Sequence, residues 1–408
     1  MVPHYVNSIQ VLQCPSPQVA WDRPKQPSCV VLLAGSKRTQ ESCPLDYDII
    51  LEQDQSLTLR DGVSIRVDIY RRKAEGKVPA VLMLDPAEWV PKGYAIGQDG
   101  HDAVEEIAKL PWCSGKIALA ENSWLAVCQW FIAAERPPHL ACIAPLEGCS
   151  DHLRESLCRG GIPDTDFAGL INGALAGTQD DKRPSMDRIQ VPAYILGSYS
   201  TMIHTIGSFR GFEEIPHQRK WLAVLGFNKP PILNLPFDRL LWHSPYTPTT
   251  NAQKLFLTQN KSLQLENEAN YGTLDYKDTE RLELSYTFRQ STTLEVPNIN
   301  PLKYLGPSGQ LRSSRRKVAP ELSQRCWQTL THDTYEPVKA EEIVKLEIWI
   351  WPSAIQFESG EQLVLQVSGN YIGFLEFEHL GVKPNSVVQQ IVHVGGNYQT
   401  YLEVTWFT

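Results

Sequence analysis

Residues 116–130 read KIALAENSWLAVCQW, and this stretch decides the fold. Its first half is short and mostly apolar, which predicts a buried strand over 116–120. Its second half is an apolar run that predicts a helix from about residue 125 to 135. A polar turn containing Ser123 separates the two. A strand that turns sharply into a helix is the repeating unit of a doubly wound α/β sheet.

The neighbouring segments extend this alternation in both directions. Upstream, the sequence predicts a β-hairpin from residue 45 around a turn at 60–62, an apolar strand over 78–84 and a helix over 100–110. Downstream, it predicts strands over 141–148, 191–199 and 220–227. The strand at 78–84 is continuously apolar, which is typical of a strand buried on both faces of a parallel sheet.

The second half of the chain has a different pattern. Short β segments follow one another without a helix between them: KLFL, LELSYTF, VKLEIWIW, EQLVLQVSG and YLEVTWF. This pattern predicts a sandwich or jelly roll. We therefore expect an α/β domain over 45–245 with a helical cap inserted at about 150–188, and an all-β jelly-roll domain over 246–408. Residues 1–44, rich in Pro, Ser and Gln, are expected to form an extended or poorly ordered leader with no assigned role.

Composition restricts the class of protein. The 408 residues are 42% apolar and 21% charged, as in a soluble globular protein, and the net charge of -8 disfavours nucleic acid or anionic lipid as a partner. Nine cysteines without paired spacing argue against a disulfide framework or a zinc site. No signal peptide or membrane span is evident. We expect a cytoplasmic protein with a small-molecule acyl substrate and no metal or other cofactor, and the oligomeric state stays open.

The turn at Ser123 has two interpretations. In a nucleophile elbow, a serine sits in a strained turn between strand and helix, and the next amide, here that of Trp124, points at a developing oxyanion. The alternative is an ordinary N-cap serine. The residue two before such a nucleophile is normally glycine, because strand and helix backbones nearly touch there, but this chain has Glu121. Glu121 is a tolerated turn residue, a carboxylate that repels the oxyanion, or a replacement for a lost acid or base.

Several longer stretches resemble one known family. They include LRDGVSIRVDIYRR, GHDAVEEIAKLPWCSGKIALAENSWLAVCQW, RPPHLACIAPLEGCSDHLRE, RGGIP and GSFRGFEEIP. These are similar to the cocaine-esterase and X-prolyl dipeptidyl-peptidase family of α/β-hydrolases, and NPLKYLGPSGQLRSSRR resembles the jelly-roll domain that closes such enzymes. The resemblance runs from about 45 to 408. It implies that Ser123 is the nucleophile position, with the small Ala126 three residues later as in the family, and that the Trp124 amide belongs to the oxyanion hole.

The same resemblance shows departures from the family pattern. The Asp-x-Arg-Gly segment expected after GYAI is absent, and the place of the oxyanion-hole tyrosine reads DPAEW. Thr201 stands about where the catalytic aspartate belongs, and no histidine occupies the expected place after KWLAV. His204, His217 and His243 are nearest in the sequence, and each is expected to be an ordinary loop histidine. We therefore expect no Asp-His pair at Ser123.

Three hypotheses follow. The chain is a serine hydrolase acting on an ester, amide or acyl group of a small molecule, by analogy in microbial secondary metabolism. Alternatively, it is a catalytically impaired relative that serves as a binding or scaffold protein, or the product of a truncated gene model. In the cap, Arg154 and Arg159 either bind a substrate carboxylate or form structural salt bridges.

Overall fold

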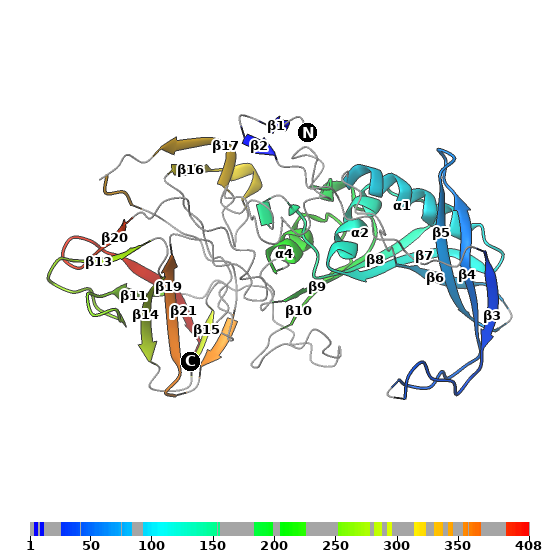
Figure 1. Cartoon of the computed structure of the whole chain (residues 1–408), viewed down its shortest axis with the longest axis horizontal. Coiled ribbons are helices and arrows are strands. Elements are labelled where there is room, and N and C mark those ends of the chain that lie inside the picture. The colour runs from blue at the N-terminus through cyan, green and yellow to red at the C-terminus, as the bar shows by residue number, and fades with distance from the viewer. Residues whose placement is uncertain are drawn as a thin grey trace. The chain divides into compact units, whose positions relative to one another are not determined.

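The structure is a computed structural model that describes residues 4–6, 9–11, 26–40, 42–74, 76–83, 93–152, 154–155, 183–198, 205–225, 252–277, 281–287, 292–295, 314–323, 330–337, 342–345, 354–357, 359–368 and 389–407. Its elements are drawn in Figure 1. The chain divides into two compact units. One comprises Met1–Pro145, Ala176–Tyr194 and Glu214–Lys220, and the other Leu146–Leu175, Ile195–Glu213 and Trp221–Thr408. The expected domain boundary near 245 stays a prediction, because residues 226–251 lie outside the described part.

The predicted hairpin is present in an antiparallel sheet. β4 (Ile49–Thr58) pairs with β5 (Ser64–Arg72) around a turn in which Gly62 has φ 86°, a conformation that favours glycine. β3 (Ser28–Leu32) pairs with the other edge of β4. β3 lies within residues 1–44, the segment expected to form an extended or poorly ordered leader, and its backbone groups find their partners on β4. The leader as a whole stays a prediction.

Two more described strands lie at the start of the chain, where β1 (His4–Val6) and β2 (Ile9–Val11) form a short antiparallel ribbon.

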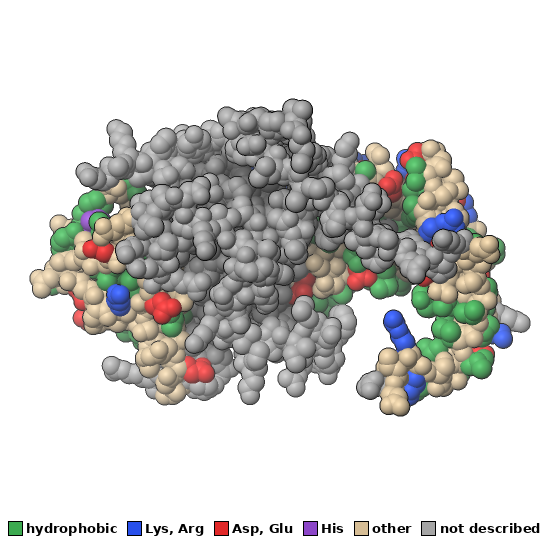
Figure 2. All heavy atoms as spheres, in the orientation of Figure 1, with side chains coloured by type: hydrophobic (Ala, Val, Ile, Leu, Met, Phe, Trp, Pro, Cys, Tyr) green, Lys and Arg blue, Asp and Glu red, His purple; other side chains and the backbone are tan. Residues whose placement is uncertain are grey.

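The β3–β4–β5 sheet carries hydrophobic side chains on its surface, as Figure 2 shows. Val31 and Tyr70 are exposed there.

The Ser123 region belongs to the predicted α/β sheet. In chain order its elements are β6 (Val78–Leu82), α1 (Gly93–Ala108), β7 (Cys113–Asn122), α2 (Trp124–Ala134), β8 (Leu140–Leu146), β9 (Ala193–Ser198), α4 (Thr205–Glu214) and β10 (Lys220–Leu225), with a 3₁₀ turn at Met186–Arg188. The strand order is β10-β9-β8-β7-β6, and β6 pairs with β7 in parallel. This order confirms the predicted α/β architecture. Most of the predicted cap, residues 156–182, lies outside the described part.

One strand is less buried than predicted. β6 is the edge strand of its sheet, and Val78 and Val81 are 41% and 63% exposed. The prediction of a strand at 78–84 is correct over Val78–Leu82, whereas burial on both faces is wrong. An edge strand has a neighbour on one side only, so an apolar run does not by itself place a strand in the middle of a sheet.

The first two helices of this sheet pack closely against each other. Every residue of α2 from Ala126 to Ala134 is buried, including Trp130 and Ile132 at 0% exposure. On α1, Gly100 has no side chain, and a Cβ there would overlap the Ile132 side chain. Glycine at this position lets the two helices approach.

The C-terminal half is all β in its described parts, as predicted. One sheet has the order β12 (Leu263–Gln264), β11 (Ala252–Leu257), β21 (Tyr401–Phe407), β15 (Thr292–Glu295) and β18 (Ala354–Phe357). Three antiparallel pairs accompany it: β13 (Gly272–Lys277) with β20 (Gln389–Val394), β14 (Arg281–Thr287) with β19 (Gln362–Ser368), and β16 (Ser314–Val318) with β17 (Leu330–Pro337). A short 3₁₀ turn covers Pro320–Leu322.

Alternating side chains build the core of this half. Leu255 and Leu257 on β11 and Leu402 and Val404 on β21 are buried, and β11 pairs with β21 although they lie far apart in the sequence. The strand predicted over 344–351 is described only at 342–345, where no strand is present.

Candidate active site

The candidate site starts at the turn between β7 and α2. β7 ends at Asn122, Ser123 forms the turn, and α2 begins at Trp124, as the sequence predicts. Ser123 has φ 59° and ψ −124°, a conformation that residues other than glycine rarely adopt. Holding a side chain there costs about 1–3 kcal/mol, which the surrounding structure must offset. Such a strained strand-to-helix turn is the geometry of a nucleophile elbow.

Ser123 also stands at the N-cap position of α2, so the capping alternative has a direct structural test. Its carbonyl accepts the amides of Ala126 at 3.0 Å and Val127 at 3.1 Å, which begin the helix. Its side chain makes no capping hydrogen bond to the described residues of α2. A capping serine places its hydroxyl on an early helix amide from a β-region backbone, and Ser123 does neither. The geometry favours the elbow over the cap.

Trp124 is the first residue of α2. Backbone amides at the first turn of a helix point out of its N-terminus, and the helix dipole places partial positive charge there. In a nucleophile elbow, the amide that directly follows the serine is the one that donates to the oxyanion, and Trp124 occupies this place in the chain.

Glu121 is accommodated by a local hydrogen bond. Its Oε1 accepts the amide of Asn122 at 3.0 Å, so the carboxylate turns back onto its own backbone. This shows how the turn tolerates a side chain where glycine is usual. It also keeps a carboxylate two residues from Ser123, where negative charge opposes an oxyanion.

A buried amide side chain lies behind the turn, and the sequence interpretation missed it. Gln129 on α2 is 2% exposed. Its Nε2 donates to the Glu121 carbonyl and to the Ala144 carbonyl on β8, each at 3.3 Å, and its Oε1 accepts the Ala144 amide at 3.1 Å. The available signal was a single amide residue in the otherwise apolar helix WLAVCQWFIAA.

A second buried polar cluster connects α4 with the segment after β8. Arg210 on α4 contacts Glu155 at 2.9 Å and Asp151 at 3.5 Å, and these three side chains are at most 3% exposed. The Ser150 amide and hydroxyl donate to Glu155 at 2.8 and 3.0 Å. Burial raises the pKa of Glu155 to about 7, while the positive charge of Arg210 opposes this rise.

The same cluster decides between the two interpretations of Arg154. Its guanidinium lies 2.7 Å from the Asp151 carboxylate, and its amide donates to that carboxylate at 3.1 Å. Arg154 is therefore a structural salt-bridge partner. Arg159 lies outside the described residues.

Two family models match the chain on either side of its middle. The model of X-Pro dipeptidyl-peptidase (S15 family) matches residues 87–194, which include the Ser123 turn, and that of the X-Pro dipeptidyl-peptidase C-terminal non-catalytic domain matches residues 297–403. The chain belongs to the X-Pro dipeptidyl-peptidase S15 family. The resemblance inferred from the sequence is thereby confirmed.

One curated protein is similar to part of this chain. The cocaine esterase of Rhodococcus sp. (strain MB1 Bresler) is 27% identical over 195 residues, which span 37% of this chain and 34% of that protein. This chain therefore matches about a third of the length of that curated relative.

Solved structures agree at the level of fold. A CocE/NonD family hydrolase from Staphylococcus aureus superposes with a TM-score of 0.73 at 20% identity, covering 97% of this chain and 99% of the other. An aminopeptidase from the marine sediment archaeon Thaumarchaeota archaeon superposes with a TM-score of 0.57 at 10% identity, covering 91% and 99%. Together with the two family models, these likenesses in fold support an α/β-hydrolase parallel sheet followed by a β-rich C-terminal domain.

Of the residues at or near the expected acid and base positions of an S15 enzyme, Thr201, His204 and His243 lie outside the described part of the chain. His217 lies between α4 and β10, where its Nδ1 accepts the Arg219 amide at 3.0 Å, as expected of a loop histidine. The expectation that no Asp-His pair completes the site at Ser123 stays a prediction.

One histidine-carboxylate pair is too far from Ser123 to serve as its base. His139 Nδ1 lies 2.7 Å from Glu105, and the His139 carbonyl accepts the amide of Ile117 near the start of β7. Ser123 follows six residues later, which corresponds to roughly 20 Å of extended strand. The pair therefore lies at the opposite end of β7 from the elbow.

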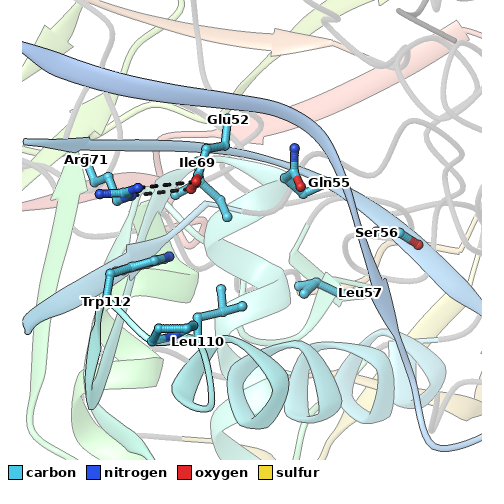
Figure 3. Close-up of a pocket in the computed structure, with 9 residues that line it drawn as sticks. Glu52, Gln55, Ser56, Leu57, Ile69, Arg71, Leu110 and Trp112 are labelled. Carbon is cyan, nitrogen blue, oxygen red and sulfur yellow. Dashed lines mark hydrogen bonds and ion pairs between the residues drawn. The ribbon is translucent and has the colours of Figure 1, made fainter. Parts of the chain in front are cut away.

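A cavity of about 320 Å³ lies beside the β4–β5 hairpin and next to the loop between α1 and β7. Figure 3 shows Leu57, Ile69 and Leu110 lining it together with Trp112. Its charged groups are already paired, because Arg71 bonds the Glu52 carboxylate through two contacts of 3.3 Å. Among the described residues that line it, none is a candidate site residue from the sequence.

No group of three or more His, Cys, Asp or Glu side chains within the described ranges is arranged to hold a metal ion. Among the described helices, none is long and apolar enough to cross a membrane.

Proposed function

We propose that this chain is a serine hydrolase that cleaves an ester or amide of a small molecule, with Ser123 as nucleophile. The observation that carries the proposal is the backbone of Ser123, at φ 59° and ψ −124° between β7 and α2, without a side-chain cap on the helix. Membership of the S15 family supports the same reaction class. By analogy, we propose a role in microbial secondary metabolism, and a cytoplasmic location stays a prediction.

The reaction needs a defined role for each group at the turn. The Ser123 hydroxyl oxygen attacks the substrate carbonyl carbon, and its proton passes to a general base. The oxyanion that forms accepts a hydrogen bond from the Trp124 amide. Collapse of this intermediate expels the alcohol or amine, which takes up a proton, and water then hydrolyses the acyl-serine. The sequence supplies no Asp-His pair for this step at the family's positions, since Thr201 stands where the aspartate belongs and no histidine follows KWLAV, so the group that accepts the proton is unassigned.

A specific observation favours a second candidate. The Glu121 carboxylate stands two residues before Ser123 and bonds the Asn122 amide. Its negative charge opposes the oxyanion, so this relative would be catalytically impaired and would serve as a binding protein.

A fluorophosphonate probe distinguishes the two candidates. We expect slow labelling of the purified protein that Ser123→Ala abolishes, because only an activated serine forms the covalent adduct. Ser114→Ala, at an exposed serine near the start of β7, is the matched control and should keep the label. If the wild-type protein takes up no label, and Glu121→Gly takes up none either, the hydrolase proposal is wrong and the binding role is favoured.

A further inference from the structure

Gln129 is a buried polar group that the proposed chemistry does not use. It is 2% exposed on a helix whose neighbouring residues are all buried. Burying an amide side chain without partners costs about 1–3 kcal/mol, so an apolar residue would suit this position better if packing alone mattered. Its hydrogen bonds must therefore explain its presence.

These bonds reach the end of the strand that precedes the nucleophile. Nε2 donates to the carbonyl of Glu121, two residues before Ser123, and also to the carbonyl of Ala144. Oε1 accepts the Ala144 amide, so a single side chain on α2 joins the end of β7 to β8. The contact with Glu121 holds the orientation of the peptide group between Glu121 and Asn122.

The orientation of that peptide group bears directly on the strained turn. Ser123 holds φ 59°, and a strained backbone persists only where surrounding contacts determine it. Gln129 supplies such a contact from inside the protein, on the side where Glu121 offers its carbonyl. Without it, the Glu121 carbonyl would be left with one fewer donor, and the turn would gain a route to a relaxed conformation.

We propose that Gln129 is a positioning residue that holds the Ser123 turn in its strained conformation through the Glu121 carbonyl. This inference rests on the proposed function for its catalytic consequence. Its structural consequence, the backbone angle of Ser123, does not depend on activity.

The test compares Gln129→Met with Ile132→Ala, both on α2. Methionine keeps the length and volume of glutamine but cannot bond Glu121 or Ala144. Ile132 is fully buried and takes no part in these bonds, so Ile132→Ala lowers stability without loosening the turn. We expect Gln129→Met to lower the maximal rate of fluorophosphonate inactivation about 10- to 100-fold with little change in probe affinity, as misplacement of a reacting group does. Ile132→Ala should lower the melting temperature and leave that rate within about twofold at a temperature where both variants are folded.

A crystal structure of Gln129→Met separates this inference from the proposed function. We expect the Glu121 peptide group to rotate and Ser123 to leave its positive φ. If the wild-type protein is not labelled but the turn relaxes in the variant, the hydrolase proposal fails and the positioning role stands. An unchanged Ser123 backbone, or equal losses of rate in the two variants, overturns the positioning role. A Gln129→Met protein that does not fold also counts against it, because the residue would then be needed for the fold as a whole.

Discussion

The buried carboxylate of Glu155 makes the stability of the folded state depend on pH, and its shifted pKa sets the size of this dependence. Its pKa is raised from 4.5 to about 7, mainly by burial. Between these values the folded state holds a proton that the unfolded state has released. The stability contributed by this group is therefore fully present below pH 4.5 and is lost as the pH rises through about 7. Two and a half pH units correspond to roughly 3–4 kcal/mol at most, because each unit is worth about 1.4 kcal/mol.

Glu155→Gln should remove this dependence, because an amide does not titrate in this range. The new side-chain NH₂ meets either the Ser150 amide or Arg210, both of which are donors, so the variant is less stable at every pH. The slope of stability with pH is therefore the quantity to compare. Glu106→Gln, at a partly exposed carboxylate paired with Lys109, is the matched control and should keep the wild-type slope.

Hydrogen exchange measured by mass spectrometry on peptides covering α4 suits this test, because it reports local opening around Arg210 in a chain with two units. Opening free energies are compared from pH 4.5 to 7.5 after correction for intrinsic exchange rates. We expect those of the wild-type protein to fall across this range and those of Glu155→Gln to stay level. Parallel profiles for the two proteins would refute the assignment of the pH dependence to Glu155.

Two further predictions concern the packing and charge around α1. Gly100→Ala should destabilise the protein by about 1–2 kcal/mol, since overpacking against Ile132 outweighs the better helix propensity of alanine. In an Ile132→Ala background the same substitution should cost much less, because the overlapping side chain is gone. If the two substitutions have additive effects in thermal unfolding, the predicted overlap with Ile132 is wrong. Hydrogen bonding to Arg60 lowers the pKa of Asp102 to about 2, so its stabilising contribution is present above pH 4 and lost as the pH falls toward 2. Asp102→Asn should therefore lower the melting temperature at pH 6 and approach the wild-type value near pH 2.5, whereas an equal difference at both pH values would rule this out.

The sequence alone determined the local architecture around Ser123. The apolar run of β7, the polar turn and the apolar helix α2 follow from patterns within about twenty residues, and the structure confirms each of them. The all-β character of the second half was predictable for the same reason, because alternation along a strand marks its buried face. Resemblance to the S15 family then assigned a proposed role to Ser123.

Tertiary structure decided what depends on partners distant in the chain. β3 became a sheet strand only by pairing with β4. Among the described strands, β6 lies at the edge of its sheet because it pairs only with β7. The pattern of apolar residues tells which face of a strand is buried, but not which strand lies beside it. Which strands pair depends on how segments distant in the chain pack together, and a short stretch of sequence does not contain this information.

The polar interior shows the same limit most clearly. Gln129 is the single amide side chain in α2 and Arg210 the single cation in α4, and neither helix sequence indicates which groups these side chains contact. Folding brings Gln129 to the backbone of β7 and β8, and Arg210 to the carboxylates of Asp151 and Glu155. Burial makes these contacts important for stability, because a polar group removed from water destabilises the fold unless it finds hydrogen-bond partners within the protein.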